Sequence, residues 1–418
     1  MANHTIAVVG GGAAGLIAAG IAAQHGARVT LFEKNTKVGR KLYITGKGRC
    51  NVCNASDVQT VMANVPRNPR FLYSALDAFS PQDTQAFFES LGVSLKVERG
   101  NRVFPVSDRA ADIIDALLRF VRAQGVHIVF QTVEEVLTKD GAVTGVRAGG
   151  RVYPAQRVIL ATGGASYPLT GSTGDGYRFA EQTGHRVVAP NPSLVPLVEA
   201  GNTCGALMGL SLRNVQMTAY EGKKKIYQDF GELLFTHFGL SGPLVLSASA
   251  HMRHFGSKPY HVEIDLKPAL DESKLDKRLL ADFEKYKNSD FVNALGELLP
   301  RKLIPVIVAR SGIEPHLKVN SVTREQRRAL LEQLKYFRID IAGARPISEA
   351  IITSGGVSVK EIDPKTMQSK KVSGLYFAGE VLDVDAYTGG FNLQIAWSTG
   401  HAAGLAAAQD IDTEEQIP

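Results

Sequence analysis

Two cysteines in the segment Gly48–Asn54 have the spacing of a redox pair, Cys50-x-x-Cys53. Such a pair exchanges electrons only where a thiol ionises readily and a donor can reach it. The sequence holds no second nucleotide-binding motif, so no path from a pyridine nucleotide to the pair is indicated. We predict that the pair is not catalytic and that the segment belongs to a cofactor site. With three cysteines in all, the chain fits a reducing, cytoplasmic setting.

Acid–base candidates are few. His237, in FTHFGLSGP, and Tyr387, just before Gly389-Gly390, could each donate a proton to a substrate. A satisfied barrel histidine and a packing tyrosine are the competing interpretations. Three more histidines lie in one segment, at His251, His254 and His261. No carboxylate or cysteine accompanies them at ligand spacing, so we predict no metal site.

A glycine motif near the N-terminus carries the strongest chemical signal. The apolar run Ile6–Val9 is followed by Gly10-x-Gly12-x-x-Gly15 and an alanine-rich helical stretch, and a second apolar run ends in Glu33. The first glycine permits a tight turn, the second lets the backbone approach a pyrophosphate, and the third lets helix and strand pack closely. Glu33 is placed to accept from a ribose hydroxyl group. This pattern predicts a dinucleotide-binding strand–turn–helix unit.

FAD and NAD share this motif, and two later segments favour FAD. Arg157–Gly164 is a buried strand running into Ala-Thr-Gly-Gly, and Gly374–Asp385 is another that ends in Gly-Glu. Gly389-Gly390 then precede a helix whose N-terminus would face the flavin. NAD(P)H could serve as a transient electron donor, without a dedicated second Rossmann domain.

The composition predicts a soluble, folded protein of two or three domains. It has 418 residues, of which 44% are hydrophobic and 21% charged, and its formal net charge is +6. The charge suits anionic ligands, and scattered surface Lys and Arg explain it better than a nucleic-acid groove. The uncharged stretch 5–23 is interrupted by a glycine triplet, so we predict no membrane segment. The oligomeric state stays open.

The pattern of apolar residues and turns in the sequence changes after residue 190. Residues 191–270 alternate short β-type runs with turns, which predicts an antiparallel barrel or sheet. Residues 271–336 have helical periodicity, and Phe337–Gly343 is a strand that rejoins the barrel or sheet. Thr323-x-x-Gln326 is a capping box. One helical stripe is expected to bury Leu275, Leu279, Leu280 and Phe283.

Six segments of the chain together resemble the bacterial flavoprotein family of the BaiN/RdsA type. They are residues 37–54, 102–113, 160–177, 233–246, 351–357 and 374–404. The resemblance implies an α/β fold: a Rossmann-like, two-dinucleotide-binding-type FAD domain with an inserted antiparallel β-barrel and a small helical domain. In this chain the FAD domain would be residues 1–190 with 346–418. The β-barrel would be residues 191–270 with 337–345, and the helical domain would be residues 271–336.

The resemblance also implies which residues contact FAD. They are Gly10, Gly12, Ala14, Gly15, Glu33, Lys34, Arg40, Lys41, Gly48, Arg49, Cys50, Asn51, Val133, Thr162, Gly163, Glu380, Asn392 and Leu393. In this family a threonine is common where the chain has Cys53, which favours a packing role for that thiol. Independently of the family, Arg40, Lys41, Lys47 and Arg49 form a basic cluster suited to two phosphate charges.

The expected activity is that of an FAD-dependent oxidoreductase acting on a small or amphipathic organic molecule. Members of the family include enzymes that reduce conjugated C=C bonds of 3-oxo bile acids and others that oxidise aminoacetone. Reduction of an activated C=C bond, as in an enone, is the preferred expectation, and an amine oxidase of the aminoacetone type is the alternative. A flavin-dependent RNA-modifying or nucleic-acid-binding protein, and a FAD-binding scaffold without turnover, are further hypotheses.

Overall fold

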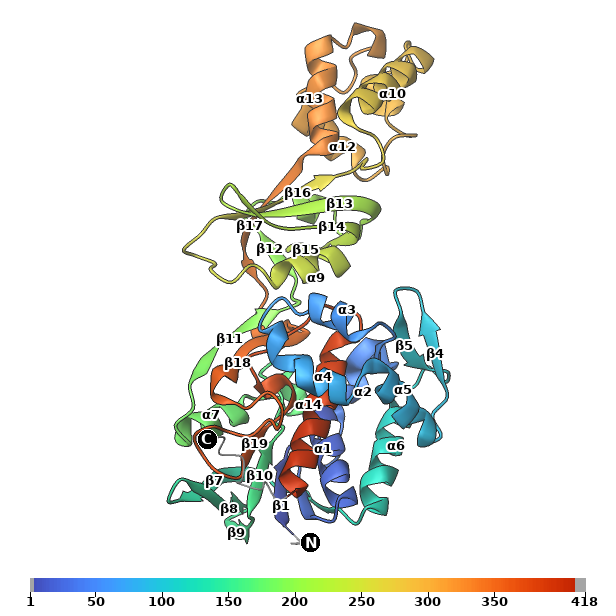
Figure 1. Ribbon diagram of the computed structural model, residues 1–418. Helices are drawn as coiled ribbons and strands as arrows, with labels where there is room; N and C mark the ends of the chain where they lie inside the picture. Colours follow the sequence, from blue (N-terminus) through green and yellow to red (C-terminus); the bar gives the residue numbers. More distant parts are fainter. Residues whose placement is uncertain (1–3, 410–418) are drawn as a thin grey trace, which may run out of the picture. The chain divides into compact units, whose positions relative to one another are not determined.

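In the computed structural model, which describes residues 4–409, a five-stranded parallel sheet forms the framework of the N-terminal part (Figure 1). Its strand order is β19-β10-β1-β2-β6. The strands span Leu375–Phe377, Arg157–Leu160, Thr5–Val9, Arg28–Phe32 and His127–Val129, in that order. The central strands are short apolar runs because both faces of the sheet are covered. Parallel pairing brings the carboxyl ends of β1, β2 and β10 to one edge.

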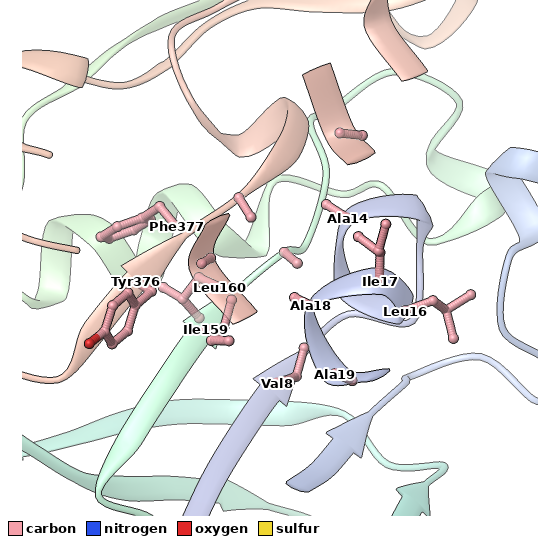
Figure 2. Packing of buried hydrophobic residues seen from close by; sticks show 14 of the residues in the cluster. Val8, Ala14, Leu16, Ile17, Ala18, Ala19, Ile159, Leu160, Tyr376 and Phe377 are labelled. Carbon is pink, nitrogen blue, oxygen red and sulfur yellow. The ribbon is translucent and has the colours of Figure 1, made fainter. Parts of the chain in front are cut away.

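Two helices that are apolar on nearly all sides pack on this sheet. They are α1, Ala13–Gln24, and α14, Phe391–Ala408. Figure 2 shows buried side chains of α1 beside those of β1, β10 and β19. Glycines allow the two helices to touch, since a Cβ at Gly400 would lie 2.5 Å from the carbonyl oxygen of Ala14. Burial on every face explains why residues 5–23 carry no charge. Within residues 4–409, no helix combines the length and the apolar character that a membrane crossing requires.

Smaller elements surround the parallel sheet. The helices are α2 (Arg40–Ile44), α3 (Val58–Ala63), α4 (Tyr73–Ala78), α5 (Pro81–Ser90), α6 (Ala110–Ala123) and α7 (Asp175–Gln182). Three small antiparallel sheets are also present. The first consists of β3 (Cys53–Asn54), β5 (Arg102–Pro105) and β4 (Leu95–Glu98), and the second of β7 (Val133–Lys139), β8 (Ala142–Ala148) and β9 (Arg151–Pro154). The third pairs β11 (Val187–Ser193) with β18 (Ile352–Val357). Helix α6 covers α1, where a Cβ at Gly20 would lie 2.1 Å from the Phe120 ring.

The inserted part contains a closed antiparallel barrel, which decides between the barrel and the open sheet that the sequence allowed. Its strands are β12 (Leu197–Glu199), β15 (Gly239–Ser241), β14 (Lys224–Phe235), β13 (Ser211–Glu221), β16 (Tyr260–Asp265) and β17 (Phe337–Ala344). Strand β17 alternates buried and exposed residues, with Phe337, Ile339 and Ile341 inside. The predicted strand at 337–343 therefore closes the barrel.

Helices of the inserted part share one hydrophobic cluster with the barrel. They are α8 (Thr203–Ala206), α9 (Pro243–Ser249), α10 (Glu272–Lys285), α11 (Phe291–Ala294), α12 (Ile304–Ser311) and α13 (Arg324–Lys335). The capping box is present, with Thr323 accepting from the N–H of Gln326. Leu275, Leu279 and Phe283 are buried, but the expectation for Leu280 is wrong: it lies one position off the stripe and is 45% exposed.

The chain divides into two compact units, Met1–Ser193 with Ile347–Pro418 and Leu194–Pro346. The first unit holds the parallel sheet and the second the barrel and its helices. Because barrel and helices share a core, a separate helical domain at 271–336 stays a prediction. The outermost residues of the predicted FAD domain, 1–3 and 410–418, lie outside the described part.

Candidate functional site

The turn between β1 and α1 brings the backbone very close to two neighbours. Gly10 has a φ of +108°, and a Cβ there would lie 2.5 Å from the carbonyl oxygen of Ala161. A Cβ at Gly15 would lie 1.8 Å from the carbonyl oxygen of Gly10, so α1 packs directly on the turn. At Gly12, by contrast, a Cβ would meet no described atom within 4 Å. Helix α1 begins here without a side-chain cap, which leaves its first N–H groups available to an anion.

Glu33 directly follows β2 beside this turn and is 7% exposed. Its Oε2 accepts from the N–H of Gly11 at 2.9 Å, and its Oε1 accepts from the backbone N–H of Asn35 at 2.8 Å. Such donors replace the hydrogen bonds to water that a buried carboxylate loses. The two contacts fix the acidic group at the carboxyl end of the sheet, where open α/β folds bind nucleotides.

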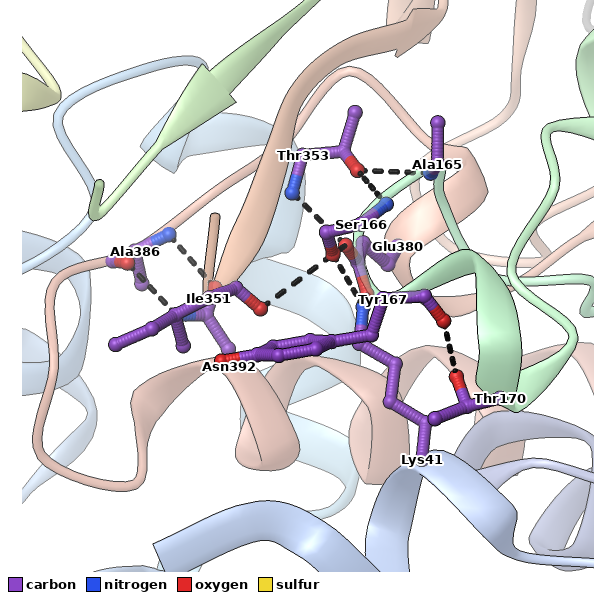
Figure 3. Close-up of polar contacts among 10 residues, drawn as sticks. All are labelled: Lys41, Ala165, Ser166, Tyr167, Thr170, Ile351, Thr353, Glu380, Ala386 and Asn392. Carbon is purple, nitrogen blue, oxygen red and sulfur yellow. Dashed lines mark hydrogen bonds and ion pairs between the residues drawn. The ribbon is translucent and has the colours of Figure 1, made fainter. Parts of the chain in front are cut away.

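A polar network joins α2 to the end of the parallel sheet (Figure 3). Lys41 Nζ lies 2.6 Å from both Glu380 Oε2 and Ser166 Oγ. Glu380 Oε1 accepts from the backbone N–H of Thr353 at 2.8 Å and from Ser166 Oγ at 3.2 Å. The Lys41–Glu380 ion pair is largely buried, so its geometry is rigid rather than averaged by solvent.

These elements surround a cavity in the first unit that is partly enclosed and partly open to solvent. The predicted contact residues that line it are Gly10, Gly12, Ala14, Glu33, Lys34, Arg40, Lys41, Val133, Thr162, Gly163, Glu380, Asn392 and Leu393. They come from segments as far apart as β1, β7 and α14, and the fold brings them together.

Five predicted contact residues do not line this cavity: Gly15, Gly48, Arg49, Cys50 and Asn51. Gly15 serves helix packing, as described above. The Arg49 guanidinium instead forms ion pairs with Glu98 and Asp108, and Arg49 Nε lies 2.7 Å from Asp108 Oδ1. The guanidinium carbon also lies 4.1 Å from the centroid of the Phe104 ring. In the Asn51 amide orientation that satisfies both its oxygen and its nitrogen, the oxygen accepts from the N–H of Gly390 at 3.0 Å.

The basic cluster expected at the pyrophosphate is therefore divided. Arg40 and Lys41 line the cavity, whereas Lys47 is exposed outside it and Arg49 is engaged by carboxylates. The sequence places all four within ten residues, but a left-handed loop separates the two pairs. Gly46, Lys47, Gly48 and Cys50 all have positive φ in this loop. Lys41 is itself engaged by Glu380, so Arg40 is the member of the cluster best suited to a phosphate in the cavity.

Both thiols of the Cys-x-x-Cys pair are buried, and they are not joined by a disulfide. Burial raises the pKa of Cys50 to about 12, and burial with the neighbouring Cys50 raises the pKa of Cys53 to about 12. Cys53 Sγ contacts the carbonyl oxygen of Pro81 at 3.9 Å. Protonated, water-excluded thiols are poor nucleophiles, which agrees with a packing role.

Tyr167 is a site candidate that sequence reasoning missed. Its backbone is left-handed, with φ +52° and ψ 59°, directly before Pro168. A side chain in this conformation costs about 1–2 kcal/mol, and a following proline restricts the backbone further. The carbonyl oxygen of Tyr167 accepts from the N–H and the Oγ1 of Thr170, at 2.8 and 2.7 Å. The Tyr-Pro pair before a glycine-rich stretch was visible, but its strained geometry was not.

The two acid–base candidates, His237 and Tyr387, lie in different units of the chain. His237 is exposed in the second unit, where its ring packs edge-on against Phe238. Tyr387 is half-buried in the first unit, and its backbone N–H donates to the carbonyl oxygen of Asn64 at 3.0 Å. No group of three potential metal ligands occurs among residues 4–409, including the histidines at 251, 254 and 261.

The cavity fits FAD in ways that do not depend on the family. The space at Gly12 admits a bulky group against the N-terminus of α1. Thr162 lines the cavity, but its Oγ1 is buried toward Gly176, where a Cβ would lie 2.0 Å from it, so this hydroxyl group does not face the ligand space. Apolar side chains of the lining, including Leu42 and Ile352, suit a flat ring.

Sheet, glycine turn and cavity together define a Rossmann-type, FAD-dependent oxidoreductase. Residues 4–406 match the sequence profile described as "HI0933-like protein Rossmann domain", and the chain belongs to this family. It is 33% identical over 410 residues to a 3-dehydro-bile acid delta(4,6)-reductase of Clostridium scindens, covering 97% of this chain and 99% of the relative. It is 32% identical over 408 residues to a ribosomal RNA dihydrouridine synthase of Haemophilus influenzae, covering 96% and 98%.

A solved structure with a similar fold is the 3-ketosteroid delta1-dehydrogenase of Sterolibacterium denitrificans, with a TM-score of 0.51 and 13% identity. The similarity covers 97% of this chain and 99% of that one. At this identity it supports the fold alone.

Proposed function

We propose that this protein uses bound FAD to reduce a C=C bond conjugated with a carbonyl group. The observation that carries the proposal is the similarity, over nearly the whole chain, to two relatives whose names describe the same bond change in different molecules. A delta(4,6)-reductase saturates C=C bonds of a 3-oxo steroid skeleton, and a dihydrouridine synthase saturates the C5=C6 bond of a uracil ring. Both bonds are activated by a nearby carbonyl group.

The described residues suggest how the cofactor is held. The N–H groups at the start of α1, beside Gly12, would bind the pyrophosphate, and Arg40 would add a charge-assisted contact. Glu33 would accept from the adenosine ribose. Asn392 and Leu393, at the N-terminus of α14, would face the flavin ring. Bound FAD supplies a hydride from its N5 atom, and the chain supplies position and polarity.

Gly48, Arg49, Cys50 and Asn51 have a different role in this proposal. They lie outside the cavity lining, and their contacts are internal to the protein. We assign them to the shape of the loop that follows α2, whose first residue, Thr45, does line the cavity. NAD(P)H would reduce the flavin transiently, because the described residues contain one parallel sheet and no second one to hold it.

Stopped-flow spectroscopy under anaerobic conditions tests the proposal. The holoenzyme is mixed with NADH, NADPH or aminoacetone, and the bleaching of the flavin is followed. The reduced enzyme is then mixed with a 3-oxo-4-ene bile acid or with a ribosomal RNA transcript. Reduction by a pyridine nucleotide and reoxidation by either acceptor support the proposal. Reduction by aminoacetone alone would replace it with the amine oxidase alternative.

A uridine in ribosomal RNA is the second candidate substrate, and the distribution of charge favours it. Residues 194–346 contain 22 Lys and Arg against 17 Asp and Glu, a net charge of +5 out of +6 for the whole chain. An excess of this kind attracts a polyanion and makes its binding salt-dependent. RNA as the acceptor predicts reoxidation that slows steeply between about 50 and 200 mM salt, whereas a bile acid predicts little change.

A further inference from the structure

We propose that the hydroxyl group of Tyr167 donates a hydrogen bond to the carbonyl oxygen of the substrate at the flavin end of the cavity. The inference rests on the proposed function, since it assumes an acceptor whose C=C bond is conjugated with a carbonyl group. A donor at that oxygen stabilises the negative charge that develops there as a hydride reaches the conjugated carbon. In the balanced step the substrate gains the hydride from the reduced flavin and a proton from solvent, and the flavin is oxidised.

Tyr167 is not itself part of the cavity lining, but contacts on both sides hold its segment beside residues that are. Ser166 contacts Lys41, Glu380 and, at 3.5 Å, the carbonyl oxygen of Ile351. On the other side Thr170, which lines the cavity, holds the Tyr167 carbonyl oxygen. Figure 3 shows the Tyr167 ring extending toward Ile351 and Asn392, both of which line the cavity. The strained backbone is thus kept where it directs an aromatic ring to the predicted flavin end.

The side chain has an unused donor. The Tyr167 ring is half-buried, and no hydrogen bond from its hydroxyl group occurs within residues 4–409. Burial raises the pKa of this phenol, so the group stays protonated at neutral pH and can donate. Ser166 beside it is fully used by the network around Lys41. Of the two, the tyrosine is the group left to meet a ligand.

An apolar side chain lies beside this donor. Ile351, toward which the Tyr167 ring extends in Figure 3, lines the cavity and is 39% exposed. A hydrogen-bond donor beside an apolar side chain suits a flat ring with a carbonyl group at one end.

The first test needs no substrate. A tyrosine ring next to a flavin quenches its fluorescence by electron transfer, and phenylalanine does not. The holoenzyme carrying Tyr167→Phe should therefore show a longer flavin fluorescence lifetime than the wild type. Tyr73→Phe, on the exposed face of α4, is the matched control and should leave the lifetime unchanged. An unchanged lifetime in Tyr167→Phe would show that the ring does not face the flavin and would overturn the proposal.

The second test measures the hydrogen bond. Dithionite-reduced holoenzyme is mixed with the 3-oxo-4-ene bile acid, and reoxidation should be at least about tenfold slower in Tyr167→Phe, with FAD content unchanged. Reoxidation at the wild-type rate would overturn the inference while the proposed function stands. If the reduced wild type is reoxidised by neither bile acid nor RNA, the proposed function fails, and with it the carbonyl hydrogen bond. The lifetime would then still report whether Tyr167 faces the flavin.

Discussion

Two tight backbone segments of the first unit differ in what holds their shape. In the turn from Gly10 to Gly15, the left-handed residue is a glycine, and close neighbours forbid any side chain at either end. In the loop from Thr45 to Cys50, two left-handed residues, Lys47 and Cys50, carry side chains. The shape of the turn follows from steric constraints that the glycine pattern of the sequence already indicates. The loop is held by contacts with distant segments, including those of Arg49 with Glu98 and Asp108.

The comparison explains why one segment was easier to interpret than the other. A glycine pattern states which positions must lack a side chain, so function can be inferred from spacing alone. A loop that depends on tertiary contacts gives a misleading signal when its cysteines and arginines are considered without them. The same argument separates the cations: Arg40 lines the cavity and Arg49 supports the loop.

The largest expected effect is that of Gly15→Ala. The new Cβ would lie 1.8 Å from the carbonyl oxygen of Gly10, and backbone must move to admit it. We expect a loss of stability on the order of 3 kcal/mol, at the upper end for overpacking a tight contact, together with loss of FAD. Urea denaturation of the apoprotein measures the first and flavin absorbance the second. A variant as stable as the wild type would contradict the steric account of the turn.

Gly12→Ala should separate binding from folding at the same turn. Gly12 has a φ of −86°, which alanine adopts freely, and its Cβ would meet no described atom. The apoprotein should therefore unfold like the wild type, while the Kd for FAD rises about tenfold or more because the methyl group occupies the place of the pyrophosphate. Isothermal titration of the apoprotein with FAD measures this. Equal affinity would remove the pyrophosphate from this position.

Two arginine variants sharpen the comparison between turn and loop. Arg40→Gln should weaken FAD binding by about tenfold, as expected for one charge-assisted phosphate contact, and leave the apoprotein's stability unchanged. Arg49→Gln should do the reverse, with a slightly lower melting temperature of the apoprotein and a difference that shrinks at high salt. Calorimetry and FAD titration of both variants check this. Weaker FAD binding in Arg49→Gln alone would restore the sequence-based role of Arg49.

The cysteine pair should give the smallest effects. Cys53→Thr should keep turnover within about twofold and change stability by less than about 1.5 kcal/mol, because a hydroxyl group can use the same carbonyl oxygen of Pro81. Loss of turnover with FAD retained would indicate thiol chemistry after all.

Thiol ionisation provides a pH test of the same burial. The folded-state pKa of both thiols, about 12, lies above the unmodified value of 9.0, so their contribution to stability is present below pH 9 and is lost as the pH rises toward 12. Each thiol should reduce the free energy of unfolding by about 1.4 kcal/mol per pH unit in that window. Urea midpoints at pH 8, 9.5 and 10.5 measure it. In native protein at pH 8, neither thiol should react rapidly with a disulfide reagent.

Sequence reasoning reached the framework of the fold because its signals are local. The strands around Gly10 and Glu33, the capping box at Thr323 and the strand at 337–343 all follow from periodicity and end residues. The positions of Arg49 and Tyr167 do not, because they depend on the pairing of β4 with β5 and on a left-handed residue before a proline. Leu280 shows the limit of helical periodicity, since one position decides between core and solvent.

The most direct test of the proposed activity is the product itself. Holoenzyme, NADPH and a 3-oxo-4-ene bile acid are incubated without oxygen, in parallel with a ribosomal RNA transcript, and both acceptors are analysed by mass spectrometry. The proposal predicts that one of them gains two hydrogen atoms per catalytic cycle and that FAD-free protein produces nothing. A third incubation holds aminoacetone in place of NADPH and both acceptors, and oxygen is admitted to it. Unchanged bile acid and RNA, with aminoacetone consumed and hydrogen peroxide formed in that third incubation, would contradict C=C reduction and establish an oxidase.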